Sequence, residues 1–354
     1  MTIESILNNS KELAEKMRYH FDLPSKNILN FSKEAEDLRQ YQYEHSIHIT
    51  EKITPKLYRL FQLVSEKLFI PSNIVEGFVY ASNDMQAECF SAHPENCAIR
   101  ISSALIEKLT EKELSFVIGH EIGHFLLNHV RNLDQSTDHE GLIQKRAQEI
   151  SSDRIGLWVC EDINIALSAI IKIVSGLRNE DLGRDKLSFM SQIKEVNKDF
   201  DRSHLSHPPF ILRGRALFHF AISDFFKRND VNYYDADQIK KIDNRIKRDQ
   251  EDYIDNFSNY EINKLIENYS FWYVVKYTLQ DKKLSKMEQS LIEGKFGKQK
   301  LKGLINLLSE YSQSELNSFL TQKIKENKDR ILDKVPKRFN IIENEIKEFC
   351  KENL

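Results

Sequence analysis

The chain has 354 residues, of which 40% are hydrophobic and 30% charged, and its formal net charge is -3 at pH 7. This length is enough for two domains and a substantial core, and the nearly balanced charge argues against nucleic acid as a partner. The four cysteines have no CxxC spacing, so the sequence predicts neither a cysteine-based metal site nor a redox motif.

The N-terminal part is predicted to begin with helices and to continue into short strands. Residues 1–42 have a helical pattern, and residues 56–67 form an amphipathic helix that ends before Pro71. Three β-prone runs follow, separated by turn-rich pieces: Val75–Tyr80, Gln86–Phe90 and Cys97–Ile101. We expect these runs to build a small sheet beside the next helix.

The next segment is predicted to be a buried helix that starts near residue 111. Thr110 and Glu113 have the spacing of a capping box, and apolar residues occupy almost every side of the helix that follows. Gly119 and Gly123 are poor helix formers. We therefore expect another backbone to approach the helix closely at these two positions.

This helix carries the motif His120-Glu121-Ile122-Gly123-His124. Positions i and i+4 lie on one face of a helix, so both histidines can direct a ring nitrogen at one ion. Glu121, rotated by about 100°, misses the ion but can reach a water bound to it. Zinc lowers the pKa of such a water, and the carboxylate can then transfer its proton to a leaving amine. The motif predicts a catalytic zinc site with Glu121 as the general base.

A second predicted helix, from about Leu142 to Cys160, contains candidates for the rest of the site. Glu149 and Asp153 share one face of it, and the chain before it is long enough to turn through residues 132–138 and run back beside the first helix. We expect Glu149 to be the third ligand, with a fourth position open for water. Asp153 is expected to accept a hydrogen bond from a ligand histidine. The alternative is that both are ordinary solvated charges.

Two further histidines bear on this site. His207 lies in the segment Ser206-His207-Pro208-Pro209, where proline favours an extended backbone, so its imidazole is expected on a stiff loop facing the open side of the metal. His204 is an alternative for the same role. His129 lies five residues after His124, about 140° around the helix, and is expected to face away from the metal and cap the helix end.

Taken in order, these motifs resemble those of the M48 zinc metallopeptidases, the group that contains CAAX-prenyl endoproteases and the heat-shock protease HtpX. The resemblance runs from about residue 53 to residue 220. It implies Glu121 as general base and acid, His207 as the group that stabilises the oxyanion, and Arg213 as a support for that loop. It also implies gluzincin ligation of one zinc ion per chain by His120, His124 and Glu149.

The chain departs from this family in two places. Family members often carry an Asn-Ala-Phe type edge strand where this chain has Gln86-Ala87-Glu88-Cys89-Phe90, which we expect to pair with an extended substrate. No run approaches the roughly 18 to 20 apolar residues needed to cross a bilayer, and the first thirty residues lack the apolar core of a signal peptide. The sequence thus predicts a soluble, cytoplasmic form that is not embedded in a membrane.

We therefore predict an α+β, mostly helical chain with a gluzincin-type metalloprotease core and a small sheet beside the active helix. The expected divisions are an N-terminal helical segment (1–50), a zinc metallopeptidase domain (51–225) and a C-terminal helical region (226–354). Seven lysines lie between Lys282 and Lys302, and we interpret them as a solvated helix face rather than a nucleic-acid site.

Three functions are consistent with the sequence. The leading one is a zinc endopeptidase that hydrolyses a protein or peptide substrate. A second is a regulatory gluzincin resembling the ImmA/IrrE repressor proteases, against which the Ser206-His207-Pro208-Pro209 segment argues. The third is a non-enzymatic scaffold with a vestigial metal site, against which the intact general base Glu121 argues.

Overall fold

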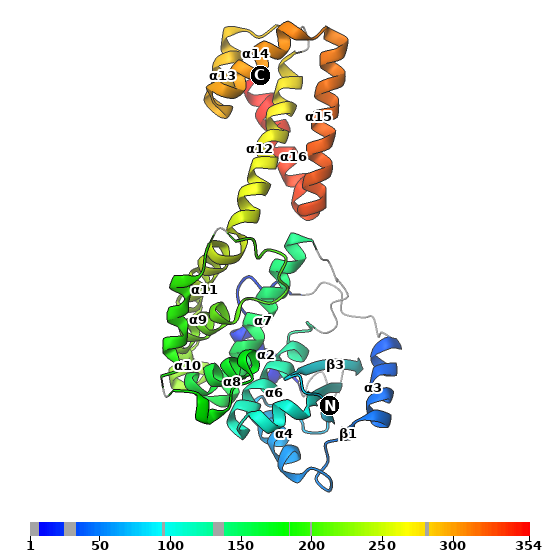
Figure 1. Cartoon of the computed structure of the whole chain (residues 1–354), viewed down its shortest axis with the longest axis vertical. Helices are drawn as coiled ribbons and strands as arrows, with labels where there is room; N and C mark the ends of the chain where they lie inside the picture. The colour runs from blue at the N-terminus through cyan, green and yellow to red at the C-terminus, as the bar shows by residue number, and fades with distance from the viewer. Residues whose placement is uncertain are drawn as a thin grey trace. The chain divides into compact units, whose positions relative to one another are not determined.

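The computed structural model describes residues 7–24, 33–93, 96–129, 138–183, 185–198, 200–279 and 283–354. Packing divides the chain into two compact units. The N-terminal unit comprises residues 1–135, 141–198 and 205–254, and the C-terminal unit is mainly residues 255–354. Helices dominate both, and the described strands form one four-stranded sheet in the N-terminal unit (Figure 1). The predicted α+β, mostly helical class is confirmed.

The sheet has the strand order β1-β2-β4-β3. Strands β2 and β4 are parallel, whereas β1 pairs with β2 and β3 pairs with β4 in antiparallel fashion. The three predicted strands are confirmed, and β1 was missed because it has only two residues. Strand β3 lies at one edge of the sheet, and in the part of the chain that the structure describes no strand pairs with its second side. The strands are β1 (Ile47–His48), β2 (Val75–Tyr80), β3 (Ala87–His93) and β4 (Asn96–Ser102).

The helices of the N-terminal unit pack against this sheet and against one another. The predicted capping box is present, because Thr110 Oγ1 accepts from the Glu113 amide while the Glu113 carboxylate accepts from the Thr110 amide. The expected turn over residues 132–138 lies almost entirely outside the described residues. The helices are α2 (Asn8–Met17), α3 (Lys33–His45), α4 (Pro55–Lys67), α5 (Ser103–Lys108), α6 (Glu111–Leu126), α7 (His139–Cys160), α8 (Ile163–Ser175), α9 (Phe210–Ala221), α10 (Asp224–Arg228) and α11 (Ala236–Gln250).

Helices α6 and α7 cross at glycines. A Cβ atom on Gly123 would lie 3.1 Å from the Ser152 Cα, and one on Gly119 would lie 3.2 Å from the Gly156 Cα. A Cβ on Gly156 would lie only 2.6 Å from the carbonyl oxygen of Phe116, closer than real Cβ atoms come. The predicted close approach of another backbone is confirmed, and it sets the helix with the two histidines directly against α7.

Helix α11 packs into the N-terminal unit, although the sequence-based division placed it in the C-terminal region. Asp243 on this helix forms a buried ion pair with Arg154 on α7, and Ile239 and Ile246 are buried. The sequence-based division rested on the many polar residues of α11 and did not take its single apolar face into account. Helix α2 is likewise part of the core rather than of a separate segment, since Met17 is fully buried. The packing therefore favours a boundary near residue 255.

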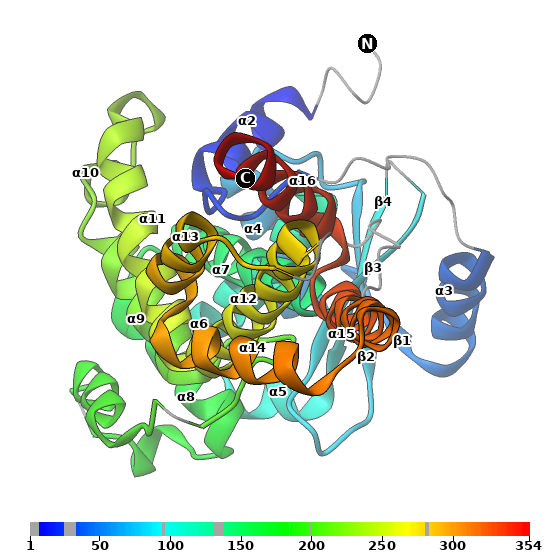
Figure 2. The same cartoon turned by 90° about the horizontal axis from the view of Figure 1, so that it is seen from above.

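The C-terminal unit is helical throughout its described part and has its own hydrophobic core. Figures 1 and 2 show α12, α15 and α16 side by side, with α13 and α14 forming a short hairpin at one end of them. The helices are α12 (Asn256–Thr278), α13 (Lys286–Phe296), α14 (Lys298–Glu310), α15 (Gln313–Lys334) and α16 (Pro336–Asn353).

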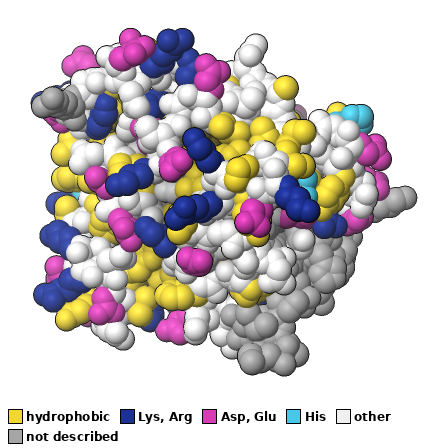
Figure 3. Space-filling view, turned by 90° about the horizontal axis from the view of Figure 1, so that it is seen from below, with side chains coloured by type: hydrophobic (Ala, Val, Ile, Leu, Met, Phe, Trp, Pro, Cys, Tyr) yellow, Lys and Arg dark blue, Asp and Glu magenta, His cyan; other side chains and the backbone are white. Residues whose placement is uncertain are grey.

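Charges of both signs are mixed on the surface. On the face drawn in Figure 3, Lys and Arg side chains are interspersed with Asp and Glu side chains and with hydrophobic ones, in keeping with the near-balanced composition. Among the described helices, none combines the length and the apolar composition that are needed to cross a bilayer.

The crossing of α6 and α7 can be tested with Gly156→Ala. The added methyl group would collide with the Phe116 carbonyl, so the free energy of unfolding should fall by about 1–3 kcal/mol. The control is Gly294→Ala on α13, where nothing lies within 4 Å of the added Cβ. Alanine is the better helix former, so this variant should be as stable as the wild type or more so. Urea unfolding followed by circular dichroism measures both, and equal stability of the two variants would contradict the crossing.

Candidate metal centre and catalytic cleft

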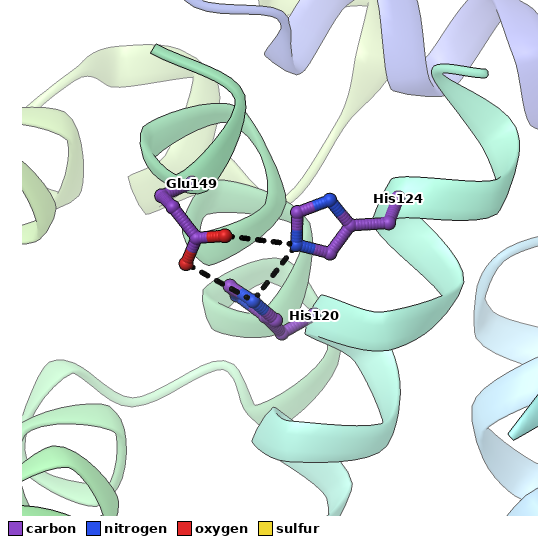
Figure 4. A group of neighbouring side chains, drawn as sticks. All are labelled: His120, His124 and Glu149. Carbon is purple, nitrogen blue, oxygen red and sulfur yellow. Dashed lines mark hydrogen bonds and ion pairs between the residues drawn. The ribbon is translucent and has the colours of Figure 1, made fainter. Parts of the chain in front are cut away.

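The crossing brings three metal-ligating side chains together. His120 and His124 come from α6 and Glu149 comes from α7, and Figure 4 shows all three pointing toward one another. Glu149 Oε1 lies 3.3 Å from His124 Nε2, and Glu149 Oε2 lies 3.6 Å from His120 Nε2. One ligand atom from each residue lies within 4.8 Å of the other two, so the group could hold a metal ion.

The ring nitrogens show that these residues fit a cation. The Nδ1 atom of His120 lies 2.9 Å from Asp153 Oδ1, and the Nδ1 atom of His124 lies 3.0 Å from His129 Nδ1. The two Nε2 atoms are turned inward and lie 3.1 Å apart. With the proton of each ring on Nδ1, both Nε2 atoms offer lone pairs beside the Glu149 carboxylate, and two imidazoles with one carboxylate are a donor set that catalytic zinc uses.

Asp153 and Arg213 hold the site together electrostatically. The Arg213 guanidinium donates from Nε to Asp153 Oδ2 at 2.8 Å, and its Nη1 lies 3.6 Å from Glu149 Oε2. Burial would raise the pKa of Asp153, but Arg213 outweighs it and the pKa is lowered. Burial acts in the same way on Glu149, where the hydrogen bond from His124 and the charge of His120 hold the pKa well below its usual range. Both carboxylates are therefore ionised at neutral pH.

The position of His129 was predicted wrongly. Its ring does not face away from the site but lies against the ring of His124. The cause is the end of α6, where Asn128 adopts a left-handed conformation with a φ of 59°. The His129 amide then donates to the His124 carbonyl and the Asn128 amide to the Phe125 carbonyl, which is a Schellman motif. Only the main chain of His129 caps the helix, while its side chain folds back over His124.

Glu121 lies between the metal centre and the sheet. Its Oε2 atom accepts a hydrogen bond of 2.8 Å from the Cys89 amide, which belongs to the open edge of β3. Sequence reasoning placed a small sheet beside this helix but missed this contact, because a main-chain amide carries no sequence signal that identifies its partner. The edge strand therefore orients the carboxylate that was predicted to act as the base.

These groups line one cleft of about 540 Å³. The cleft is lined by both candidate histidine ligands and by Glu149, Glu121, Arg213 and His207. Of the predicted edge-strand residues, Gln86, Ala87, Glu88 and Cys89 line it as well. Phe90 does not line the cleft, since its side chain is buried with Phe78 and Ala98 in a separate cluster of the core.

His207 occupies the loop that was expected for it. The loop precedes α9, and the His207 side chain is 65% exposed with its Nε2 atom 3.4 Å from Glu149 Oε1. Ser206 holds the other ring nitrogen through a hydrogen bond of 2.9 Å between Oγ and Nδ1. The imidazole is thus close to the metal centre and accessible from the cleft.

Comparison with known proteins finds similarity to peptidases in part of the chain. Residues 51–142 match the model of Peptidase family M48. A protease HtpX homolog of Pediococcus pentosaceus is 30% identical over 92 residues, which cover 25% of this chain and 28% of that protein. The plastoglobule-localized metallopeptidase 48 of Arabidopsis thaliana is 25% identical over 152 residues, which cover 34% of this chain and 44% of that protein.

The match covers only part of each protein. A protease HtpX homolog of Trichormus variabilis is 27% identical over 110 residues, or 31% of this chain and 36% of that protein. The chain therefore spans less than half the length of these relatives. No solved structure matches it significantly. The family match ends at residue 142, so the later residues are assigned by their position in the structure: Glu149, His207 and Arg213 line the cleft, and Asp153 contacts His120.

The charge balance of the site predicts a pH-dependent effect of Arg213→Met. The variant leaves two buried carboxylates without their cation, so the metal-free protein should lose about 3–5 kcal/mol of stability at pH 7. The lowered pKa values of Asp153 and Glu149 give stability that is present above their ordinary values of 3.8 and 4.5. The difference from the wild type should therefore be largest above about pH 5 and shrink as the pH falls toward 3.

The control for this measurement is Arg215→Met on the same helix. Arg215 pairs with Asp249, but both side chains are partly exposed, so the loss should be much smaller. Denaturant unfolding with a chelator present, repeated across the pH range, measures both variants. A loss in Arg213→Met that does not depend on pH would contradict the assigned charges.

Proposed function

We propose that this protein is a zinc-dependent endopeptidase, a hydrolase that cleaves peptide bonds in protein or peptide substrates. The observation that carries the proposal is the convergence of His120, His124 and Glu149 in one cleft with Glu121 and the open edge of β3. The match of residues 51–142 to peptidase family M48 supports it, as do relatives whose names describe proteases.

Each residue of the cleft has a distinct task in this proposal. A zinc ion held by the three ligands would supply a Lewis acid that polarises the scissile carbonyl and makes water more acidic. Glu121 takes the proton of the attacking water and delivers it to the leaving amine nitrogen. Its carboxylate is oriented for this by the Cys89 amide at 2.8 Å.

The surrounding residues position the reacting groups. An extended substrate adds as a strand to the open edge of β3 through main-chain hydrogen bonds. His207 donates a hydrogen bond to the oxygen that becomes negatively charged when water adds to the carbonyl. Asp153 accepts from His120 Nδ1 and so fixes its tautomer, while Arg213 keeps Asp153 ionised.

The family match favours this function over the two alternatives. A repressor protease of the ImmA/IrrE kind would share the His-Glu-Ile-Gly-His motif, but residues 51–142 match family M48. A scaffold with a vestigial site would not need an ordered general base, yet Glu121 is buried and hydrogen-bonded at the cleft wall. Loss of activity on changing Glu121 alone distinguishes an enzyme from a scaffold.

Two variants should distinguish the loss of zinc from the loss of activity. The wild type should carry close to one zinc ion per chain and cleave an unfolded protein such as casein. His124→Ala should lose most of the zinc because one of its three ligands is gone, whereas Glu121→Gln should keep the zinc. Glu121→Gln should nevertheless lower kcat at least a hundredfold, since the base is missing. Elemental analysis and casein cleavage measure both, and equal zinc in His124→Ala and the wild type would refute the ligand assignment.

His207→Phe tests the proposed oxyanion donor. Such donors are typically worth about 2.7–4 kcal/mol in the transition state, so kcat should fall roughly a hundredfold or more while KM and zinc content stay nearly constant. The matched control is His204→Phe, an exposed histidine three residues earlier, which should change kcat much less. If His207→Phe releases zinc instead, this residue is a ligand, and if kcat is unchanged, the loop is only structural.

A further inference from the structure

A chain of hydrogen bonds leads from the metal centre to the N-terminal segment. His129 Nδ1 lies 3.0 Å from His124 Nδ1, and His129 Nε2 lies 3.0 Å from Asp22 Oδ2. The His129 side chain is 4% exposed and the Asp22 side chain is completely buried. The chain therefore runs through the interior, where water does not compete for these hydrogen bonds.

The Asp22 carboxylate is held in place by neighbours on α7 and on its own segment. Ser151 Oγ donates to Oδ2 at 2.7 Å, and Gln144 Nε2 donates to Oδ1 at 2.9 Å. Arg18 Nη1 lies 3.3 Å from Oδ2. The Tyr19 amide donates to Ser151 Oγ at 3.0 Å, so the segment is also attached through its main chain.

The direction of the hydrogen bonds follows from metal binding. For His124 to offer Nε2 to a metal, its Nδ1 must carry the proton, which it then donates to His129 Nδ1. His129 must therefore carry its own proton on Nε2, from which it donates to the Asp22 carboxylate. A carboxylate at the far end can only accept, so each proton in the chain has one consistent place.

We propose that His129 and Asp22 are positioning residues for the metal, which orient His124 and increase its affinity as a ligand. This inference rests on the proposed zinc site. Asp153 does the same for His120 directly, whereas His124 is connected to a carboxylate through a second imidazole. Asp22 lies before residues 51–142, so a segment outside the family match completes the metal site.

The full-length protein can test this through zinc affinity, measured by competition with a chelator at constant pH. Asp22→Asn and His129→Phe should each weaken zinc binding about 10- to 100-fold, the usual effect of losing such a partner. The double variant should bind zinc about as well as His129→Phe alone, because the chain is already interrupted there. Cobalt in place of zinc should give a changed visible spectrum in both single variants.

The matched control is Glu15→Gln, the same carboxylate-to-amide change on the same segment. Glu15 is 55% exposed and binds Arg18, so its replacement should leave zinc affinity unchanged. The unfolding midpoint of each metal-free variant shows whether it is folded and how far the segment's attachment is weakened. A lower midpoint with zinc affinity within twofold of the wild type would overturn the proposal and make the network a purely structural attachment. Absence of zinc binding in the wild type would refute the proposed function itself.

Discussion

The metal centre depends on one constraint, the backbone contact between α6 and α7. Glycines at the crossing let the two helices approach until a Cβ on Gly156 would touch the Phe116 carbonyl. At this distance Glu149 on α7 reaches both histidines on α6, and Asp153, one turn further on, reaches the outer nitrogen of His120. The distances within the site are thus set by main-chain contact, which is less adaptable than side-chain packing.

Around this crossing, buried carboxylates make the centre a favourable place for a cation. Glu149, Glu121 and Asp153 are all buried, and within the cleft Arg213 is the nearby permanent cation. Arg213 makes two hydrogen bonds to Asp153 and approaches Glu149 only at 3.6 Å. Burial also lowers the pKa of His129, and this outweighs Asp22, so that imidazole is neutral. The neutral His129 ring can therefore accept a hydrogen bond at Nδ1 from His124 while its Nε2 atom donates to Asp22.

Local signals in the sequence predicted much of this arrangement. The Thr110 capping box gave the start of α6, alternating β-prone runs gave β2 to β4, and the two glycines gave the close crossing. The features that the sequence did not predict are those that depend on how a helix ends or on contacts between distant segments. An ideal helix sends His129 away from the metal, but the left-handed Asn128 ends the helix first. The hydrogen bond from the Cys89 amide to Glu121 joins a sheet edge to a helix, and no sequence pattern in either segment predicts it.

The contacts of Asp22 also have a consequence for the order of events in folding. Asp22 is separated from His129 by 107 positions and from Ser151 by 129. Closing loops of this length costs chain entropy before the contacts repay it, so long-range contacts of this kind tend to form late. Local helix formation can bring His120 and His124 onto one face early, with the outer partner of His124 still missing. Under the role proposed for Asp22 and His129, the docking of the N-terminal segment would therefore be the step of refolding that completes the metal affinity.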